Sequence, residues 1–194
     1  RKRKFASIGV HDLSQLSPPF RVISVDKKYK FIPLAEEKEM SIEDILELHP
    51  KGKEYAHLMS DMETYPVIID SEDKVLSFPP IINGDHTTVN EQTRDFFIDV
   101  TGWDERSCEA CLLLVCLSLA ERGGEIESIQ IKNWDQELLT VPRGDSKNHK
   151  VPDRLIRNIL GVELSKTEIA NSIKKMGGEL VDTRTVTDGP DKIE

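Results

Sequence analysis

The alternation of apolar and polar residues predicts several short strands in the first three quarters of the chain. Residues 6–10 form an apolar run, and residues 11–13 are expected to turn the chain after it. Residues 20–25 and 29–34 alternate on either side of a charged trio, which predicts a hairpin. Further strands are expected at residues 65–70, 75–78, 95–100, 126–131 and 138–141, and the first two of these form a second hairpin.

Capping residues mark the helices between these strands. Ser41 is an expected N-cap of a helix that is ended by residues 49–52. Residues 53–59 add one or two helical turns, on which His57 either lies at the surface or faces a pocket. The longest helix is expected at residues 104–122. Because Ser118 is the only polar residue between positions 110 and 120, this helix is expected to be buried nearly all round.

The order of these elements predicts the fold class α+β, with mixed sheets and a long buried helix, because strands and helices do not alternate regularly. Residues 142–150 are polar and turn-rich, so they are expected to link two domains, 1–143 and 144–194. The second domain contains helices at 152–161 and 165–176 and a following strand at 180–186. Two short capped helices resemble a helix-turn-helix, although an ordinary helical pair has the same pattern.

Composition restricts the classes of function. The chain has 194 residues, of which 38% are hydrophobic and 31% charged, as in a soluble globular protein. Its apolar runs are shorter than the about 18 residues that span a bilayer, so no membrane partner is expected. A net charge of −9 argues against broad binding to DNA or RNA but allows contact with the end of an RNA. The chain lacks a starting methionine and a signal peptide, and we expect it to be an excised fragment of a longer protein.

The cysteines, Cys108, Cys111 and Cys116, lie in the longest predicted helix. An odd number on a shared helix argues against disulfides and for a reducing cytosol. The first two have the spacing of a zinc or redox motif, but a zinc site needs a second pair of ligands, which the sequence does not supply at suitable spacing. We therefore expect buried core cysteines and no metal site.

The loop at residues 77–87 has the highest density of candidate functional groups. Two prolines end the preceding strand, and Asn83, Asp85, His86 and Thr87 surround one glycine. The alternative is a simple strand exit with an Asn-Gly turn. Asp99 is the second feature of interest, because a carboxylate within the apolar segment FFIDV needs hydrogen-bond partners. Strand geometry places Phe97, Asp99 and Thr101 on one face, although Asp99 alternatively organises a turn through backbone amides.

The segments FPPIINGDHT, residues 78–87, and TRDFFIDVTG, residues 93–102, closely resemble the beta chains of archaeal and eukaryotic phenylalanyl-tRNA synthetases. The resemblance runs from about residue 8 to the C-terminal end. It implies that residues 1–143 form an editing module, which hydrolyses tyrosine wrongly attached to phenylalanine tRNA, and that residues 144–194 begin a winged-helix-like domain. It also implies a cytoplasmic heterotetramer whose alpha chain carries the ATP- and magnesium-dependent synthetic site; no cofactor is expected in this fragment.

An editing site of this kind needs an aromatic-sized apolar slot with fixed polar groups, because a pocket made for phenylalanine rejects tyrosine by only about 100-fold. Buried groups that pair with a phenol oxygen are left unpaired by phenylalanine, at about 1–3 kcal/mol each. The candidate walls of the slot are apolar residues of the hairpin, the loop and the adjacent strand: Ile68, Phe78, Pro79, Ile81 and Phe97. The candidate polar groups are Ser77, Asn83, Asp99 and Thr101.

The sequence contains no recognisable nucleophile, so a water activated near the ester is the expected attacking group. Asn83, Asp85 and His86 are the candidate catalytic residues; Asp85 and His86 orient that water, contact the terminal nucleotide or are solvated loop residues. Two other functions remain open. In one, the same fold is a structural or tRNA-contacting module without activity, and in the other the cysteines serve metal or redox chemistry.

Overall fold

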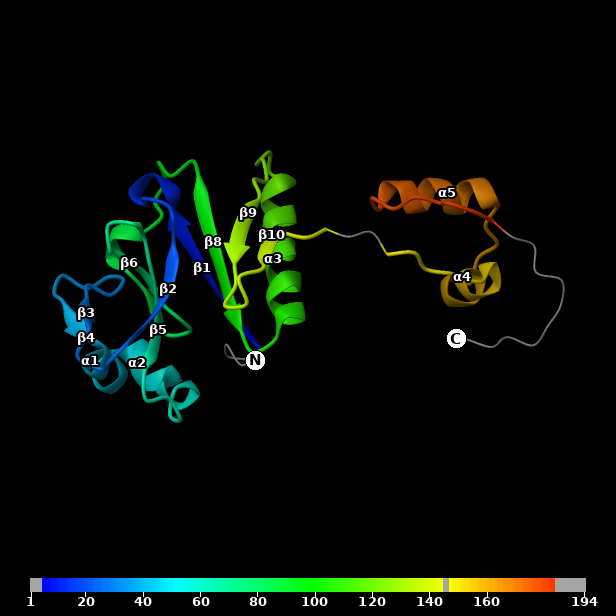
Figure 1. Ribbon diagram of the computed structural model, residues 1–194. Coiled ribbons are helices and arrows are strands. Elements are labelled where there is room, and N and C mark those ends of the chain that lie inside the picture. Colours follow the sequence, from blue (N-terminus) through cyan, green and yellow to red (C-terminus); the bar gives the residue numbers. More distant parts are fainter. Residues whose placement is uncertain (1–4, 145–146, 184–194) are drawn as a thin grey trace. The chain divides into compact units, whose positions relative to one another are not determined.

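The protein divides into two compact units, Arg1–Gly144 and Asp145–Glu194, which are described separately. The structure is a computed structural model that describes residues 5–144 and 147–183 (Figure 1). Within the described residues, helices and several antiparallel sheets are interspersed along the chain. The predicted fold class, α+β, is confirmed.

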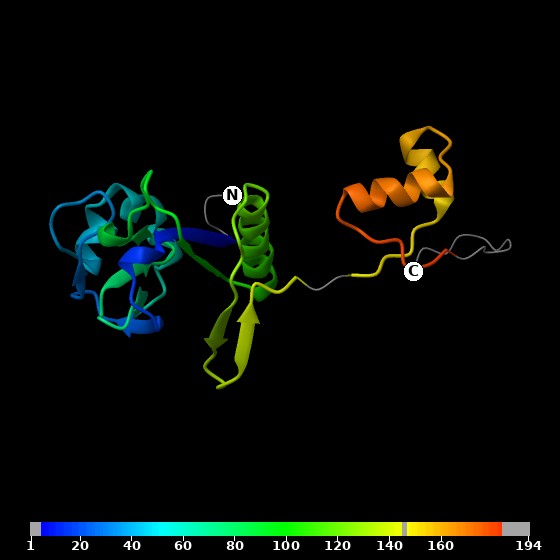
Figure 2. The same cartoon turned by 90° about the horizontal axis from the view of Figure 1, so that it is seen from above.

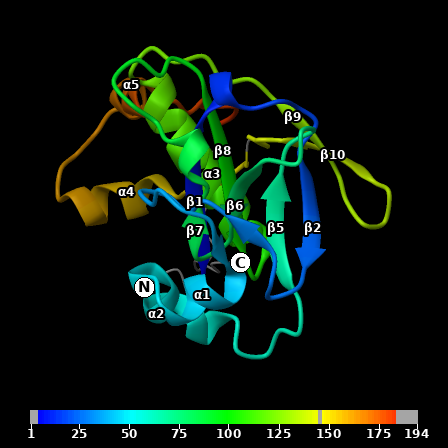
Figure 3. The ribbon, with the colours of Figure 1, turned by 90° about the vertical axis from the view of Figure 1, so that its left-hand side faces the viewer.

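A four-stranded antiparallel sheet with the order β2-β5-β6-β7 forms the larger part of the first unit. Its strands are β2 (Arg21–Val25), β5 (Tyr65–Ile69), β6 (Val75–Phe78) and β7 (Ile82–Asn83). The predicted hairpin of β5 and β6 is confirmed, and Figure 3 shows β5 beside β2.

The hairpin predicted for residues 20–34 is wrong. β2 pairs with β5, whereas β3 (Lys30–Phe31) pairs with β4 (Met40–Ser41). Pairing with β5 brings Val25 into the same buried cluster as Val67. The two-residue strand β3 is too short to bury β2 in this way. Long-range burial of apolar side chains therefore overrides the local hairpin signal.

The central sheet buries apolar side chains on both faces, because neighbouring residues of β5 point in opposite directions. One face packs with helices α1 (Ile42–Glu47) and α2 (Pro50–Tyr55) in the larger cluster, whose fully or nearly fully buried members include Ile42, Ile45, Val67, Ile69, Phe78 and Ile81. On the other face a smaller cluster contains Leu16, Ile68 and Leu76, against which Leu13, Phe20 and Phe97 pack. This second face is where the candidate site lies.

The two helices of the larger cluster begin where side chains cap them. Ser41 is the N-cap of α1, as expected, and it also forms a capping box with Asp44. The first helix ends before residues 49–52, as expected, but the second begins at Pro50 rather than 53, because the His49 imidazole accepts a hydrogen bond from the Lys51 amide and caps it. His57 lies exposed on the short 3-10 turn that follows, η2 (Ala56–Leu58).

A second, two-stranded antiparallel sheet consists of β1 (Ala6–Asp12) and β8 (Phe96–Gly102). In Figure 1 it runs between the four-stranded sheet and the long helix α3 (Glu105–Ala120). The predicted turn at residues 11–13 is wrong for its first two residues, since His11 and Asp12 continue β1. Asp12 accepts hydrogen bonds from the hydroxyls of Ser14 and Thr93, which lower the pKa of its carboxyl group and hold the strand end in place.

Helix α3 is capped by Asp104, and Gly123 follows it in the left-handed conformation. The helix packs on β1 and β8 (Figure 2). Gly102, at the end of β8, lies close to the Cys108 thiol of the helix. The prediction that α3 is buried nearly all round is wrong, since Leu114 is 66% and Leu117 50% exposed. A two-stranded sheet is narrow and covers only one side of a helix.

The hairpin of β9 (Ile129–Lys132) and β10 (Leu138–Val141) completes the described part of the first unit. The strand predicted from residue 126 therefore begins three residues later. Ile129, Ile131 and Leu138 of this hairpin are exposed, as is Trp134 at its turn.

The second unit contains α4 (Asp153–Leu160) and α5 (Lys166–Lys175). α4 ends at Gly161 in the left-handed conformation, and Ser165 and Glu168 form the expected capping box for α5. Residues 180–183 of the predicted final strand are not in a strand, and residues 184–186 lie outside the described residues. Within the described chain, every helix is too short or too polar to cross a bilayer.

The turn between β5 and β6 depends on the fully buried carboxylate of Asp70. Its Oδ1 accepts hydrogen bonds from the backbone amides of Glu72 and Lys74, and its Oδ2 accepts one from Ser17. This single side chain thereby joins the hairpin turn to the loop before β2.

We predict that Asp70→Ala lowers the free energy of unfolding by about 3 kcal/mol, because three backbone donors lose a charged acceptor. Chemical denaturation of the 194-residue chain measures the change. The matched control is Asp73→Asn in the same turn, where the exposed ion pair with Arg21 is worth less than about 1 kcal/mol. Equal effects of the two substitutions would contradict this role of Asp70.

Candidate functional site

Three of the candidate residues lie in one row across the central sheet. Ile68 of β5 pairs with Ser77 of β6, which in turn pairs with Asn83 of β7. Cross-strand partners point to the same face of a sheet, so the three side chains share the face of the smaller apolar cluster. A bulge makes this alignment possible: Ile69 pairs with Val75, so Leu76 is an extra residue before Ser77.

The opposite wall of the site comes from β8. Phe97 packs into the same cluster as Ile68, and its ring lies 4.3 Å from that of Phe20, centroid to centroid. Phe97, Asp99 and Thr101 alternate along β8 and therefore share this face, as expected. The candidate residues Ile68, Ser77, Phe97, Asp99 and Thr101 are thus on the two surfaces that meet at the smaller cluster.

A chain of buried hydrogen bonds runs from β8 through β1 to the loop after β7. Asp99 Oδ1 lies 2.7 Å from His11 Nε2, and His11 Nδ1 lies 2.7 Å from Thr87 Oγ1. Thr87 donates to the Gly84 carbonyl oxygen at 3.1 Å. His11 is fully buried and the Asp99 side chain is 9% exposed, so the carboxylate in the apolar strand has the partner it needs.

Gly9 makes room for this contact. It pairs with Asp99 across the two strands, and a Cβ at Gly9 would lie 1.9 Å from Asp99 Oδ1 and 2.8 Å from His11 Nε2. Because Gly9 has no side chain, the Asp99 carboxylate and the His11 imidazole can occupy the space beside it and make contact.

Thr101 presents a polar group that the protein itself leaves unused. Its Oγ1 is buried and has no hydrogen-bond partner among the described residues. A buried hydroxyl of this kind is costly unless a ligand or water pairs with it. Thr101 lies two residues beyond Asp99 on the same face of β8.

The structure assigns different surroundings to the loop residues. Asp85 opens the 3-10 turn η3 (Asp85–Thr87), and its carboxylate accepts a hydrogen bond from the Ala35 amide at 3.0 Å. His86 is exposed at the surface, yet partial desolvation by the loop lowers the pKa of its imidazole. Pro79 is buried in the tight turn that joins β6 to β7, rather than on a strand face.

His11, Gly9 and Thr87 are the residues that sequence reasoning missed. The sequence pattern places His11 in a turn and Thr87 in the polar loop. The available signal was a glycine and a histidine two positions apart at the end of an apolar strand, since glycine in a strand marks a close approach. Their partner Asp99 is about 90 residues away, and its identity follows only from the pairing of β1 with β8.

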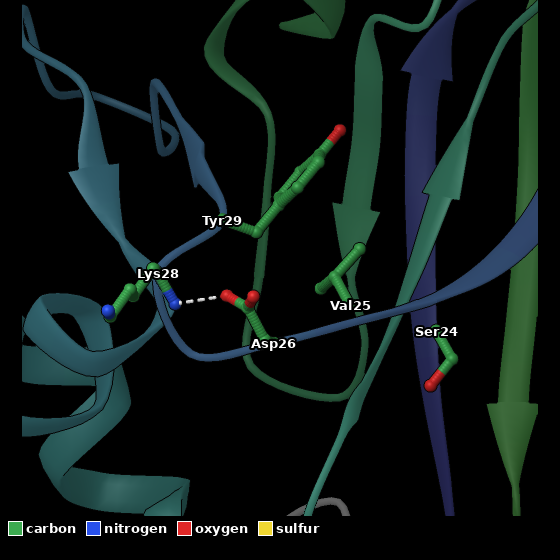
Figure 4. Close-up of a pocket in the computed structure, with 5 residues that line it drawn as sticks. All are labelled: Ser24, Val25, Asp26, Lys28 and Tyr29. Atoms are coloured by element: carbon green, nitrogen blue, oxygen red, sulfur yellow. Dashed lines mark hydrogen bonds between the residues drawn. The ribbon is translucent and has the colours of Figure 1, made fainter.

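Two shallow hollows in the surface lie away from this site. One is lined by Ser24, Val25, Asp26, Lys28 and Tyr29 at the end of β2, where the Asp26 carboxylate accepts a hydrogen bond from the Lys28 amide (Figure 4). The other lies beside it along β2, near Met62 and Pro66. Neither contains a candidate residue.

The cysteines do not form a reactive site. Cys116 is buried, whereas Cys108 and Cys111 are only partly buried, so the expectation of a fully buried set is wrong for two of the three. Burial raises the pKa of the Cys108 and Cys116 thiols, which disfavours the reactive thiolate. In residues 5–144 and 147–183, no group of three or more His, Cys, Asp or Glu side chains is arranged to hold a metal ion.

The fold and the site define an α+β module with a polar hydrogen-bond chain set against an apolar cluster. Residues 5–111 match the family model of the B3/4 domain, and the chain belongs to this family.

The similarity extends beyond that domain to beta subunits of phenylalanine–tRNA ligase. The chain is 47% identical to that of Methanosarcina barkeri over 188 residues, which cover 96% of this chain and 34% of the relative. It is 46% identical to that of Archaeoglobus fulgidus over 176 residues, which cover 91% of this chain and 32% of the relative. The chain thus spans about a third of the length of these relatives.

A solved structure agrees with these relatives. The structure of an N-terminal fragment of the phenylalanyl-tRNA synthetase beta subunit from Pyrococcus horikoshii matches with a TM-score of 0.87 and 39% identity, covering 95% of this chain and 53% of that fragment. The resemblance inferred from the segments at residues 78–87 and 93–102 is therefore confirmed.

We predict that Gly9→Ala lowers the free energy of unfolding by about 3 kcal/mol, because the added methyl group overlaps Asp99 Oδ1. Chemical denaturation provides the measurement. Gly144→Ala is the matched control, since a Cβ there meets no atom within 4 Å. If Gly9→Ala were as well tolerated as Gly144→Ala, the close contact of Asp99 and His11 at Gly9 would be refuted.

Proposed function

We propose that residues 1–143 form an editing module that hydrolyses the ester of tyrosine wrongly attached to phenylalanine tRNA. The similarity to phenylalanine–tRNA ligase beta subunits supports the general context. The single observation that carries the proposal is the buried hydroxyl of Thr101, which has no hydrogen-bond partner among the described residues and lies two residues beyond Asp99 on the same strand face.

This pair suits the group that distinguishes tyrosine from phenylalanine. A phenol donates one hydrogen bond and accepts another. In our proposal it donates to Asp99 Oδ2 and accepts from Thr101 Oγ1, while Phe97 and Ile68 enclose the ring and Ser77, Asn83 and Pro79 complete the slot. A phenylalanyl ester leaves these polar groups unpaired, which is how a second site selects the larger, more polar side chain.

Hydrolysis is assigned to the loop after β7. An aminoacyl ester is already activated, so positioning a water molecule against its carbonyl carbon supplies much of the rate. Asn83 and His86 are the groups we assign to this water. The lowered pKa of His86 keeps the imidazole neutral near pH 7, as a proton acceptor requires. The Asp85 carboxylate accepts a hydrogen bond from Ala35 and so holds the loop in place. We assign it no direct contact with the substrate, which makes it the weakest of the three candidates.

The rest of the proposed reaction lies outside these residues. The net charge of −9 leaves most phosphate contacts with the tRNA to other parts of the enzyme. We propose a cytoplasmic heterotetramer with an alpha chain that binds ATP and magnesium and attaches phenylalanine. The second unit, residues 144–194, is proposed to begin a winged-helix-like domain.

A second candidate function is a structural module without activity. The observation that favours it is the exposed apolar surface of α3 and of the β9–β10 hairpin, which includes Leu114, Leu117, Ile129, Trp134 and Leu138. Surfaces of this kind mark contacts with other domains or chains. This function does not require the unpaired hydroxyl of Thr101.

Replacing Thr101 by valine separates the two functions. We predict that Thr101→Val in the complete synthetase lowers the deacylation rate of Tyr-tRNA about tenfold, because one buried hydrogen bond to the phenol is lost while the shape is kept. Synthesis of Phe-tRNA is expected to stay unchanged. Thr140→Val, in the exposed face of β10, is the matched control.

The assay follows the release of radiolabelled tyrosine from preformed Tyr-tRNA. A wild-type enzyme that leaves Tyr-tRNA intact would exclude editing and favour the structural function. An active enzyme in which both threonine variants match the wild type would exclude Thr101 from the site.

A further inference from the structure

We propose that His11, held between Asp99 and Thr87, is a positioning residue that fixes the carboxylate at which the tyrosyl phenol is recognised. This inference rests on the proposed editing function and adds to it a residue that does not contact the substrate. It also couples the phenol-binding end of the site to the loop assigned to hydrolysis.

The contacts of His11 follow from its two partners. The Asp99 carboxylate only accepts hydrogen bonds, so His11 Nε2–H donates to its Oδ1 at 2.7 Å. This donor satisfies a carboxylate that is nearly buried. The other ring nitrogen, Nδ1, lies 2.7 Å from Thr87 Oγ1, and the same hydroxyl lies 3.1 Å from the Gly84 carbonyl oxygen. The imidazole thereby pairs with a different element through each nitrogen.

The surroundings restrict the carboxylate to this one arrangement. Asp99 Oδ1 and His11 Nε2 occupy the space that a side chain at Gly9 would need, and the ring of Phe97 lies beside the imidazole, with centroids 6.0 Å apart. Asp99 Oδ1 is held by His11, so Oδ2 has a defined direction relative to Thr101. Groups fixed by packing and by supporting hydrogen bonds are what substrate discrimination requires.

Thr87 makes the same chain reach the loop. It is 1% exposed and ends η3, which begins with Asp85 and His86. His11 therefore joins β1, β8 and η3 through its two nitrogens. If η3 moves, His11 Nδ1 loses its contact with Thr87. If Asp99 moves, His11 Nε2 loses its acceptor.

The test compares two buried histidines in the complete synthetase. His11→Gln carries its amide nitrogen and oxygen at one end of the side chain, whereas the ring has a nitrogen toward each partner, so the variant cannot hold both Asp99 and Thr87. We expect it to lower the ratio of Tyr-tRNA to Phe-tRNA deacylation about tenfold, with Phe-tRNA synthesis unchanged. His49→Gln is the matched control, because His49 is also buried in the first unit but caps α2 and lies 3.6 Å from Glu36 Oε1 instead of contacting the site. It should reduce stability without changing the ratio.

Thr87 provides a conservative rescue. Thr87→Ser keeps the hydroxyl and should keep the ratio, whereas Thr87→Val removes the hydrogen-bond partner of His11 Nδ1 and should lower it. If Thr87→Val and His11→Gln lowered only the amount of folded enzyme, as His49→Gln does, the positioning role would be overturned. A wild-type enzyme without Tyr-tRNA deacylation would instead overturn the proposed function itself.

A spectroscopic measurement on the 194-residue chain is independent of activity. Long-range ¹H–¹⁵N correlation of the histidine rings, assigned with His11→Gln, should show that Nε2 of His11 carries a proton, because the Asp99 carboxylate accepts from it. A ring whose Nε2 carries no proton would overturn the contact with Asp99 on which the positioning role depends.

Discussion

The contact between Asp99 and His11 is the interaction on which the site depends. A carboxylate in an apolar strand is tolerable only when a partner compensates it, and breaking such a buried pair costs about 3–5 kcal/mol. The pair joins two strands whose sequences are far apart, and Gly9 gives it the space to form. In our proposal the same contact also positions the carboxylate that recognises the phenol, so one interaction serves both stability and recognition.

The central sheet contributes the other half of the site by using its two faces differently. One face is closed by α1 and α2 around the larger cluster. The opposite face carries Ile68, Ser77 and Asn83 in one row, and the bulge at Leu76 sets that row in register. Without the extra residue, the side chains of β6 after Val75 would each point to the other face of the sheet. Ser77 would then point into the larger cluster, where a hydroxyl would lack a partner.

Local signals in the sequence predicted much of the fold. The capping boxes at Ser41 and Ser165, the helix starting after Asp104 and the β5–β6 hairpin depend on neighbouring residues, and all were predictable. The predictions were wrong where pairing or packing with distant residues determines the structure. β2 pairs with β5 because of shared burial, and α3 remains exposed on one side because the sheet beneath it has only two strands.

The candidate site shows the same limit. Period-two geometry was enough to place Phe97, Asp99 and Thr101 on one face, but it did not reveal His11, whose partners come from β8 and η3. The most direct measurement is a crystal structure of the chain with a non-hydrolysable 3′-tyrosylamino-adenosine. Our account predicts the phenol oxygen within hydrogen-bond distance of both Asp99 Oδ2 and Thr101 Oγ1. A phenol bound elsewhere, with Thr101 still unpaired, would contradict it.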